Sequence, residues 1–172
     1  MRAGEGRFLP LLPAFLFAPR GPAPRYALGA AALVVGGHLL LSLAVALLLP
    51  QPPRPDFGAP AGLAGIAFLF FGLVVFAPLV ETLIMSAPLL LIDRFAGRAP
   101  AVLASAAGWG VAHSLAAPGW GLIVWWGFLI FSVAFLVWRR RGGYWAGIGI
   151  AAAIHGLNNL LPALAVIASL PR

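Results

Sequence analysis

The sequence contains no cysteine and no lysine among its 172 residues. The absence of cysteine excludes disulfide bonds, thiol catalysis and cysteine-ligated zinc. Acidic residues are also scarce, because only Glu5, Asp56, Glu81 and Asp93 carry a side-chain carboxylate, and charged residues make up 9% of the chain. Soluble domains average about 25% charged residues. With 62% hydrophobic residues, the chain is predicted to be solvated mostly by lipid.

Five apolar segments are long enough to cross a bilayer, which takes roughly 20 helical residues. They predict an all-α fold, a polytopic transmembrane helix bundle. Helices satisfy their own backbone hydrogen bonds in lipid, and no segment shows the alternating pattern of barrel strands. At this length, residues 1–172 should form a single integral membrane domain. The predicted spans lie near residues 26–49, 61–91, 101–117, 119–138 and 144–170.

The second apolar segment is longer than an upright span needs, so we expect it to tilt or to begin at the membrane surface. Pro78 and Pro88 should bend it, since proline removes a backbone donor and crowds the preceding turn. A bend at Pro78, three residues before Glu81, would aim that side chain into the bundle. Ahead of the first span, the short apolar stretch Phe8–Ala18 lacks a clear signal-peptidase site. We expect it to be retained as a short N-terminal interfacial segment.

All eleven basic residues are arginines, and they lie between the apolar runs. If the spans alternate in direction, nine arginines fall on one face of the membrane and two on the other. The positive-inside rule then places the N-terminus in the cytoplasm. Membrane topology therefore accounts for the net charge of +7, and the expected partner is the lipid bilayer, not nucleic acid. An all-arginine basic set beside abundant Ala, Gly and Pro favours a bacterial protein, in the cytoplasmic (inner) membrane.

Glu81 is the only carboxylate inside an apolar span. A charge at mid-bilayer costs about 2.5–3.5 kcal/mol on insertion scales, so Glu81 needs a proton, a partner or a water-filled cavity. Taken alone, it fits a structural or a functional role equally well. However, His113 lies in the third segment, and His155, Asn158 and Asn159 lie in the fifth. These residue types can activate water and stabilise an oxyanion, and three spans could bring them to one cavity.

Helical spacing refines this set of polar residues. His155 and Asn159 are four residues apart, so they share one helical face. Asn158 sits about 100° around the helix from Asn159, so one of the two asparagines should face elsewhere. Trp109 precedes the histidine of its segment by four residues, which should put the indole beside the imidazole. Trp109 and Asn158 are assigned to substrate binding, whereas His38 and its neighbouring glycines indicate helix packing.

At these residues the sequence resembles the CPBP family of intramembrane proteases (CAAX proteases and bacteriocin-processing enzymes, also called ABI). The family pattern is Glu-Glu-x-x-x-Arg on one helix, Phe-x-x-x-His on a second and His-x-x-x-Asn on another. Segments 81–86, 109–113 and 155–159 are similar to these motifs and stand in the same order. The resemblance covers residues 76–161, with Trp109 in place of phenylalanine. Thr82 and Ser86 stand where the family has its second glutamate and its arginine.

The resemblance implies a membrane-embedded, glutamate-dependent peptidase similar to the type II CAAX endopeptidases. Glu81, assisted by His113, would act as general base on a water molecule that hydrolyses a peptide bond within the membrane. His155 and Asn159 would donate hydrogen bonds to the oxyanion. The implied partner is a peptide or membrane-protein substrate, with no cofactor. Nothing in the sequence marks a prenyl-binding site, so leader peptides, bacteriocin precursors and membrane regulators all remain open as substrates.

Three other interpretations stay open. Glutamate with two histidines also forms a catalytic zinc set, although no His-Glu-x-x-His helix is present. Thr82 and Ser86 favour a non-catalytic membrane scaffold or partner-binding protein derived from the same fold. A proton-coupled carrier could use Glu81 and the histidines as a relay, although no inverted repeat supports it. The sequence gives no indication of the oligomeric state.

Overall fold

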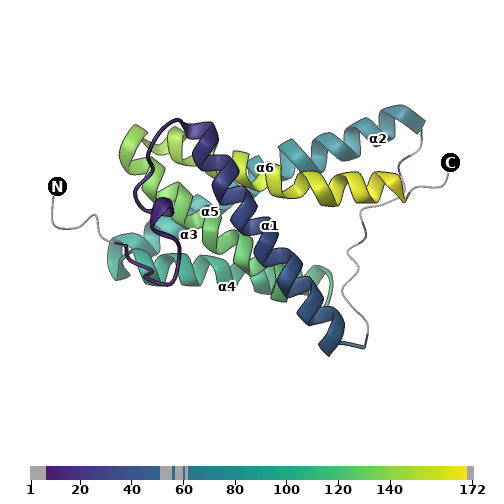
Figure 1. Ribbon diagram of the computed structural model, residues 1–172, viewed down its shortest axis with the longest axis horizontal. Helices are drawn as coiled ribbons and strands as arrows, with labels where there is room; N and C mark the ends of the chain where they lie inside the picture. The colour runs from purple at the N-terminus through teal and green to yellow at the C-terminus, as the bar shows by residue number, and fades with distance from the viewer. Residues whose placement is uncertain (1–6, 51–55, 57–59, 61, 170–172) are drawn as a thin grey trace.

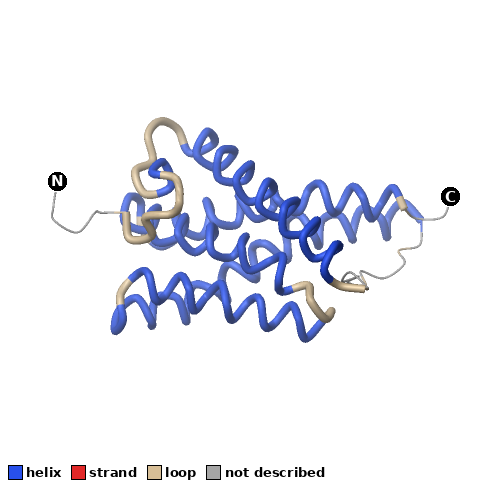
Figure 2. Tube along the Cα trace, turned by 60° about the horizontal axis from the view of Figure 1, so that its bottom comes forward, coloured by secondary structure: helices blue, strands red, loops and turns tan. Residues whose placement is uncertain are grey.

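The computed structural model describes residues 7–50, 56, 60 and 62–169. Within these residues every regular element is a helix, as Figure 2 shows. The long α-helices are α1 (Ala23–Leu48), α3 (Ala77–Ala96), α4 (Arg98–Ala116), α5 (Gly121–Gly142) and α6 (Tyr144–Ala168). Shorter elements are the 3₁₀-helix η1 (Ala14–Leu16), α2 (Gly62–Phe71) and the π-helix η2 (Gly72–Phe76). The prediction of an all-α bundle is confirmed.

Four helices of the described chain are long and apolar enough to cross a membrane: Ala23–Leu48, Gly62–Ala96, Gly121–Gly142 and Tyr144–Ala168. The second joins α2, η2 and α3 into 35 continuous helical residues, so it runs further than the predicted 61–91. The prediction of five spans is therefore close: four of the five predicted spans match these helices, and α4, predicted as the span 101–117, is not among them. Although α4 has 19 residues, its alanines, glycines, serines and histidine make it less hydrophobic than its neighbours. It lies beside α3 and α5 (Figure 1).

Helix α5 lies at the centre of the bundle, packed by α1, α4 and α6. Every residue from Gly127 to Leu136 is buried, which explains why this part of α5 is apolar on every face except at Ser132. Ser132 on α5 donates a 2.9 Å hydrogen bond to Ser105 on α4, the kind of polar contact that joins helices in membranes. A Cβ atom at Gly121 would collide with the backbone oxygen of Gly110. The glycine therefore lets α4 and α5 touch just before His113.

Helix α2 extends away from the rest of the bundle beside the C-terminal part of α6 (Figures 1 and 2). None of its residues is buried, and Leu63 and Phe68 are 84% and 78% exposed. Because this surface is apolar all round, lipid is its natural solvent. The 35-residue helix is thus a bundle helix in its second half and a lipid-exposed helix in its first.

The stretch Phe8–Ala18, expected at the membrane interface, folds back over the bundle end where α1 begins (Figure 1). Leu12 and Leu16 are buried in the core. The hydroxyl of Tyr26 donates a 3.1 Å hydrogen bond to the backbone oxygen of Leu16, and Arg7 donates to the backbone oxygen of Leu12. The segment is therefore fixed to α1 and α5 by both apolar and polar contacts.

Candidate functional site

One cavity of about 370 Å³ brings together polar side chains from four helices. Most of its remaining lining is apolar, including Phe128 and Phe131 of α5. All four residues expected to be catalytic border it, and so do a second asparagine and a third histidine. These six are Glu81 on α3, His113 on α4, His155, Asn158 and Asn159 on α6, and His38 on α1.

Glu81 and His155 face each other across the cavity. Glu81 Oε2 and His155 Nε2 are 3.9 Å apart, which is too long for a direct hydrogen bond and close enough for one small polar group to contact both. The imidazole of His155 stacks on Phe131, with ring centroids 4.5 Å apart and planes inclined by 20°. Glu81 Oε2 and His155 Nδ1 have no hydrogen-bond partner within the described residues. Apolar packing therefore holds the ring while leaving polar atoms available.

His113 is oriented by the backbone of its own helix. Its Nδ1 lies 2.9 Å from the backbone oxygen of Trp109. A carbonyl oxygen only accepts hydrogen bonds, so Nδ1 carries the hydrogen and, in the neutral ring, Nε2 is an acceptor. The ring also packs edge-on against Trp120 at 4.6 Å. His113 therefore presents an unprotonated nitrogen beside a cavity that also holds a carboxylate.

Trp109 lies beside His113 as the spacing predicts, with 5.7 Å between ring centroids. However, its indole stacks on Phe128 at 4.4 Å and 3°, and it is not among the residues that line the cavity. Its geometry supports a role in fixing His113 and gives no support to the predicted role in substrate binding.

The two asparagines form a short chain of hydrogen bonds. Asn158 Nδ2 donates to Asn159 Oδ1 at 3.0 Å, and Asn159 Nδ2 donates to the backbone oxygen of Leu73 at 3.0 Å. Both side chains border the cavity, so the expectation that one of them faces elsewhere is wrong. The cavity wraps far enough around α6 to reach both helical positions, since α1 borders it as well as α3.

The π-helix explains why the oxygen of Leu73 needs a side-chain donor. In an α-helix that oxygen would accept from the N–H of Ala77, but here Ala77 donates to Gly72. In a π-helix it would accept from residue 78, and Pro78 has no N–H. Leu73 is therefore left without either backbone partner, and Asn159 supplies the missing hydrogen bond. Pro78, which was expected to bend this helix, thus leaves a carbonyl to which α6 donates a hydrogen bond, shortly before Glu81.

Thr82 and Ser86 face the bundle interior and do not line the cavity. They are 1% and 2% exposed. The hydroxyl of Ser86 donates to the backbone oxygen of Leu83 at 2.7 Å and lies 2.8 Å from the hydroxyl of Tyr144, which joins α3 to α6. Both positions where the first motif departs from the CPBP pattern therefore belong to helix packing.

His38 is the site residue that sequence reasoning assigned to packing alone. Its Nε2 is buried without a hydrogen-bond partner in the part of the chain that the structure describes, and a Cβ atom at Gly127 would lie 3.0 Å from it. The sequence could have indicated a place in the site by residue type, because His38 is one of only three histidines and all three lie in apolar segments.

Across the described ranges, no three His, Asp or Glu side chains are arranged to hold a metal ion.

No protein-family model, curated protein or solved structure matches this chain. The resemblance to the CPBP proteases accordingly depends on the three short sequence motifs alone.

Proposed function

We propose that the chain is an intramembrane endopeptidase of the CPBP type. The observation that carries the proposal is the meeting of Glu81, His113, His155 and Asn159 at one cavity. They come from three helices and are up to 78 residues apart in the sequence. Polar side chains are costly inside a membrane protein, so four of them around one apolar cavity favour a reaction site over four separate packing contacts.

In this mechanism Glu81 is the general base. A water molecule donates one hydrogen bond to the Glu81 carboxylate and the other to Nε2 of His113, which is free to accept. The water oxygen attacks the carbonyl carbon of the scissile peptide while Glu81 takes the proton. The tetrahedral intermediate then collapses, the C–N bond breaks, and Glu81 returns the proton to the leaving amine. Atoms and charge balance over the cycle, and the steps require no metal.

His155 and Asn159 stabilise the negative oxygen of the intermediate. Asn159 uses one hydrogen of its amide nitrogen for Leu73, which leaves the second available because an amide nitrogen carries two. Removing one such donor typically costs about 2.7–4 kcal/mol of transition-state stabilisation. The hydrogen bonds to Leu73 and Asn158 fix the amide in advance, so no reorganisation is needed when charge develops.

The substrate class is a hydrophobic peptide or membrane-protein segment that approaches from the bilayer. Leu39 on α1 and Leu161 on α6 both line the cavity, and they are 66% and 57% exposed. The cavity therefore reaches the outer face of the bundle between these helices, at a surface that lipid covers. We place the protein in a bacterial cytoplasmic membrane because its basic residues are all arginines. We place its N-terminus in the cytoplasm on the arginine distribution, which counts α4 as a fifth crossing.

The test is cleavage by the purified chain in liposomes, supplied with synthetic peptides that each contain one hydrophobic span. Mass spectrometry would identify the products. Glu81→Gln keeps the size of the side chain and removes its basicity, so cleavage should fall about 10²–10⁴-fold, the usual contribution of a general base. Ser42→Ala, which alters another residue of the cavity lining, is the matched control. Wild-type activity should survive a strong chelator.

A non-catalytic scaffold is the second candidate, and the asparagine pair favours it. Asn158 and Asn159 are already bonded to each other and to Leu73, so part of the polar set has a structural task. If Glu81→Gln keeps both its fold and its cellular role, the scaffold replaces the peptidase.

A further inference from the structure

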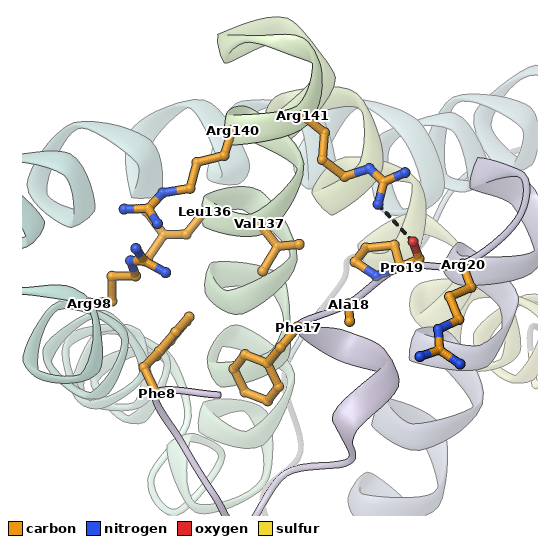
Figure 3. Close-up of a pocket in the computed structure, with 10 residues that line it drawn as sticks. All are labelled: Phe8, Phe17, Ala18, Pro19, Arg20, Arg98, Leu136, Val137, Arg140 and Arg141. Atoms are coloured by element: carbon orange, nitrogen blue, oxygen red, sulfur yellow. Dashed lines mark hydrogen bonds between the residues drawn. The ribbon is translucent and has the colours of Figure 1, made fainter. Parts of the chain in front are cut away.

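A second cavity, of about 410 Å³, has a lining quite unlike that of the Glu81 cavity, because all its charged lining residues are arginines. Figure 3 shows Arg98 and Arg140 on one side of it and Arg20 and Arg141 on the other. No acidic side chain is among the described residues that line it. The arginine pocket, as we call it, is therefore suited to a ligand with negative charge.

The walls of the arginine pocket are held in place by contacts of their own. Arg141 donates a 2.7 Å hydrogen bond to the backbone oxygen of Pro19 and lies 5.4 Å from the centre of the Trp138 ring. Arg98 lies 5.6 Å from the centre of the Phe8 ring. Such cation–π contacts hold each guanidinium in a fixed orientation. Two sides of the pocket are thus organised before any ligand arrives.

Apolar side chains make up the rest of the arginine pocket. Phe8 and Phe17 come from the N-terminal segment, and Leu136 and Val137 from the last part of α5 (Figure 3). A small inorganic anion would make no favourable contact with these apolar side chains. A molecule that combines a phosphate group with a hydrocarbon part would contact both kinds of lining.

The position of the arginine pocket also favours a lipid. It lies where α4 begins and α5 ends. Helix α5 has 22 residues, or about 33 Å at 1.5 Å per residue, close to the roughly 30 Å thickness of the hydrocarbon core. The ends of such a helix reach the level of the lipid head groups. Basic pockets between transmembrane helices at this level bind anionic head groups.

We propose that the arginine pocket binds the phosphate head group of an anionic phospholipid, with Arg20 and Arg140 supplying charge and the phenylalanines contacting the glycerol and upper acyl chain. Neither Arg20 nor Arg140 forms a hydrogen bond or ion pair with another described residue. Binding would fix the N-terminal segment against α4 and α5. The proposal is independent of the reaction at Glu81.

The experiment uses the full chain in detergent, with lipid binding measured by native mass spectrometry. Phosphatidylglycerol should bind in preference to phosphatidylcholine. The double variant Arg20→Gln/Arg140→Gln should weaken phosphatidylglycerol binding about 25-fold, roughly fivefold for each arginine near the head group. Arg94→Gln/Arg139→Gln is the matched control, because it removes the same charge from exposed arginines outside the pocket and should change binding little.

Competition separates the sources of the phosphate. Inorganic phosphate and glycerol 3-phosphate should displace the lipid only weakly, because they lack the apolar part. Equal competition by either would overturn the lipid assignment, and so would equal competition by a soluble acidic peptide. An equal loss of binding in the two double variants would show diffuse surface charge and would overturn the site itself. Circular dichroism on both variants ensures that only folded protein is compared.

Discussion

Gly156 lies where α6 packs closely against the π-helix η2. A Cβ atom added at this position would be 2.5 Å from the backbone oxygen of Val74. Ordinary van der Waals contact begins at 3.4 Å, which is about 0.9 Å longer. Because the obstacle is backbone, no side-chain rotation relieves the clash. Gly156→Ala must therefore move α6 away from η2, and with it His155 and Asn159 away from Glu81.

The magnitude follows from a comparison with a second glycine on the same helix. Overpacking of this kind costs about 1–3 kcal/mol, but alanine also gains about 1 kcal/mol over glycine in helix propensity, which would mask part of the loss. Gly149→Ala makes the same gain, and no atom lies within 4 Å of the added Cβ. The difference between the two variants isolates the clash, so Gly156→Ala should be about 1–3 kcal/mol less stable than Gly149→Ala.

Thermal unfolding of the two variants in the same detergent measures this difference. For a chain of this size the midpoint should differ by about 2–4 °C per kcal/mol. In the cleavage assay, a displacement approaching 1 Å should slow Gly156→Ala by about 100-fold relative to Gly149→Ala. If the two variants unfold at the same temperature, the close packing of α6 on η2 is refuted. If they differ in stability and cleave equally fast, the packing stands and the catalytic role of α6 fails.

Three further predictions use the same protein. Asn159→Leu leaves the backbone oxygen of Leu73 without its donor and should lower stability by about 1–3 kcal/mol in the unfolding assay. Thr82→Val removes a buried hydroxyl that has no partner within the described residues, so stability should be unchanged or higher and cleavage should persist. Arg139→Cys and Ala116→Cys place single thiols at exposed positions near opposite ends of α5, in a chain that has no cysteine. In right-side-out membrane vesicles an impermeant maleimide should label the thiol at position 116 and spare the one at 139; the reverse would invert the proposed orientation.

Hydropathy located the helices because the bilayer imposes a minimum length on every apolar span. The predicted first and last spans, 26–49 and 144–170, became α1 (Ala23–Leu48) and α6 (Tyr144–Ala168). Residues 61 and 170, at two predicted span ends, lie outside the described residues, as do Arg2, Arg54 and Arg172 of the arginine count. The third predicted span, 101–117, carries no charge, but its alanines, glycines and serines lower its hydropathy below that of the four candidate spans.

The π-helix shows what spacing alone does not determine. Pro78 predicts a disturbance of its helix from the sequence, since the missing N–H is a local property. Which backbone carbonyl loses its hydrogen-bond donor depends on whether the helix bends at the proline or forms a π turn. Which side chain then reaches that carbonyl depends on packing, because Asn159 is 86 residues from Leu73 in the sequence. The spacing of His155 and Asn159 indicated that Asn159 lies at the cavity. It did not indicate that the same side chain also donates a hydrogen bond to the backbone oxygen of Leu73.

The positions of Thr82 and Ser86 in the structure explain, in electrostatic terms, how neutral side chains can stand where the CPBP pattern has a glutamate and an arginine. One residue along a helix is a turn of about 100°, so Thr82 faces the interior while Glu81 faces the cavity. A glutamate at 82 would need a partner in that interior, and an arginine at 86 could provide it. A single charge left behind would be costly, whereas a threonine and a serine keep the interior neutral, with Ser86 bonded to Tyr144. Compared with the CPBP pattern, the two neutral side chains leave no unpaired charge behind the cavity wall, and the chemistry proposed for Glu81 does not depend on either residue.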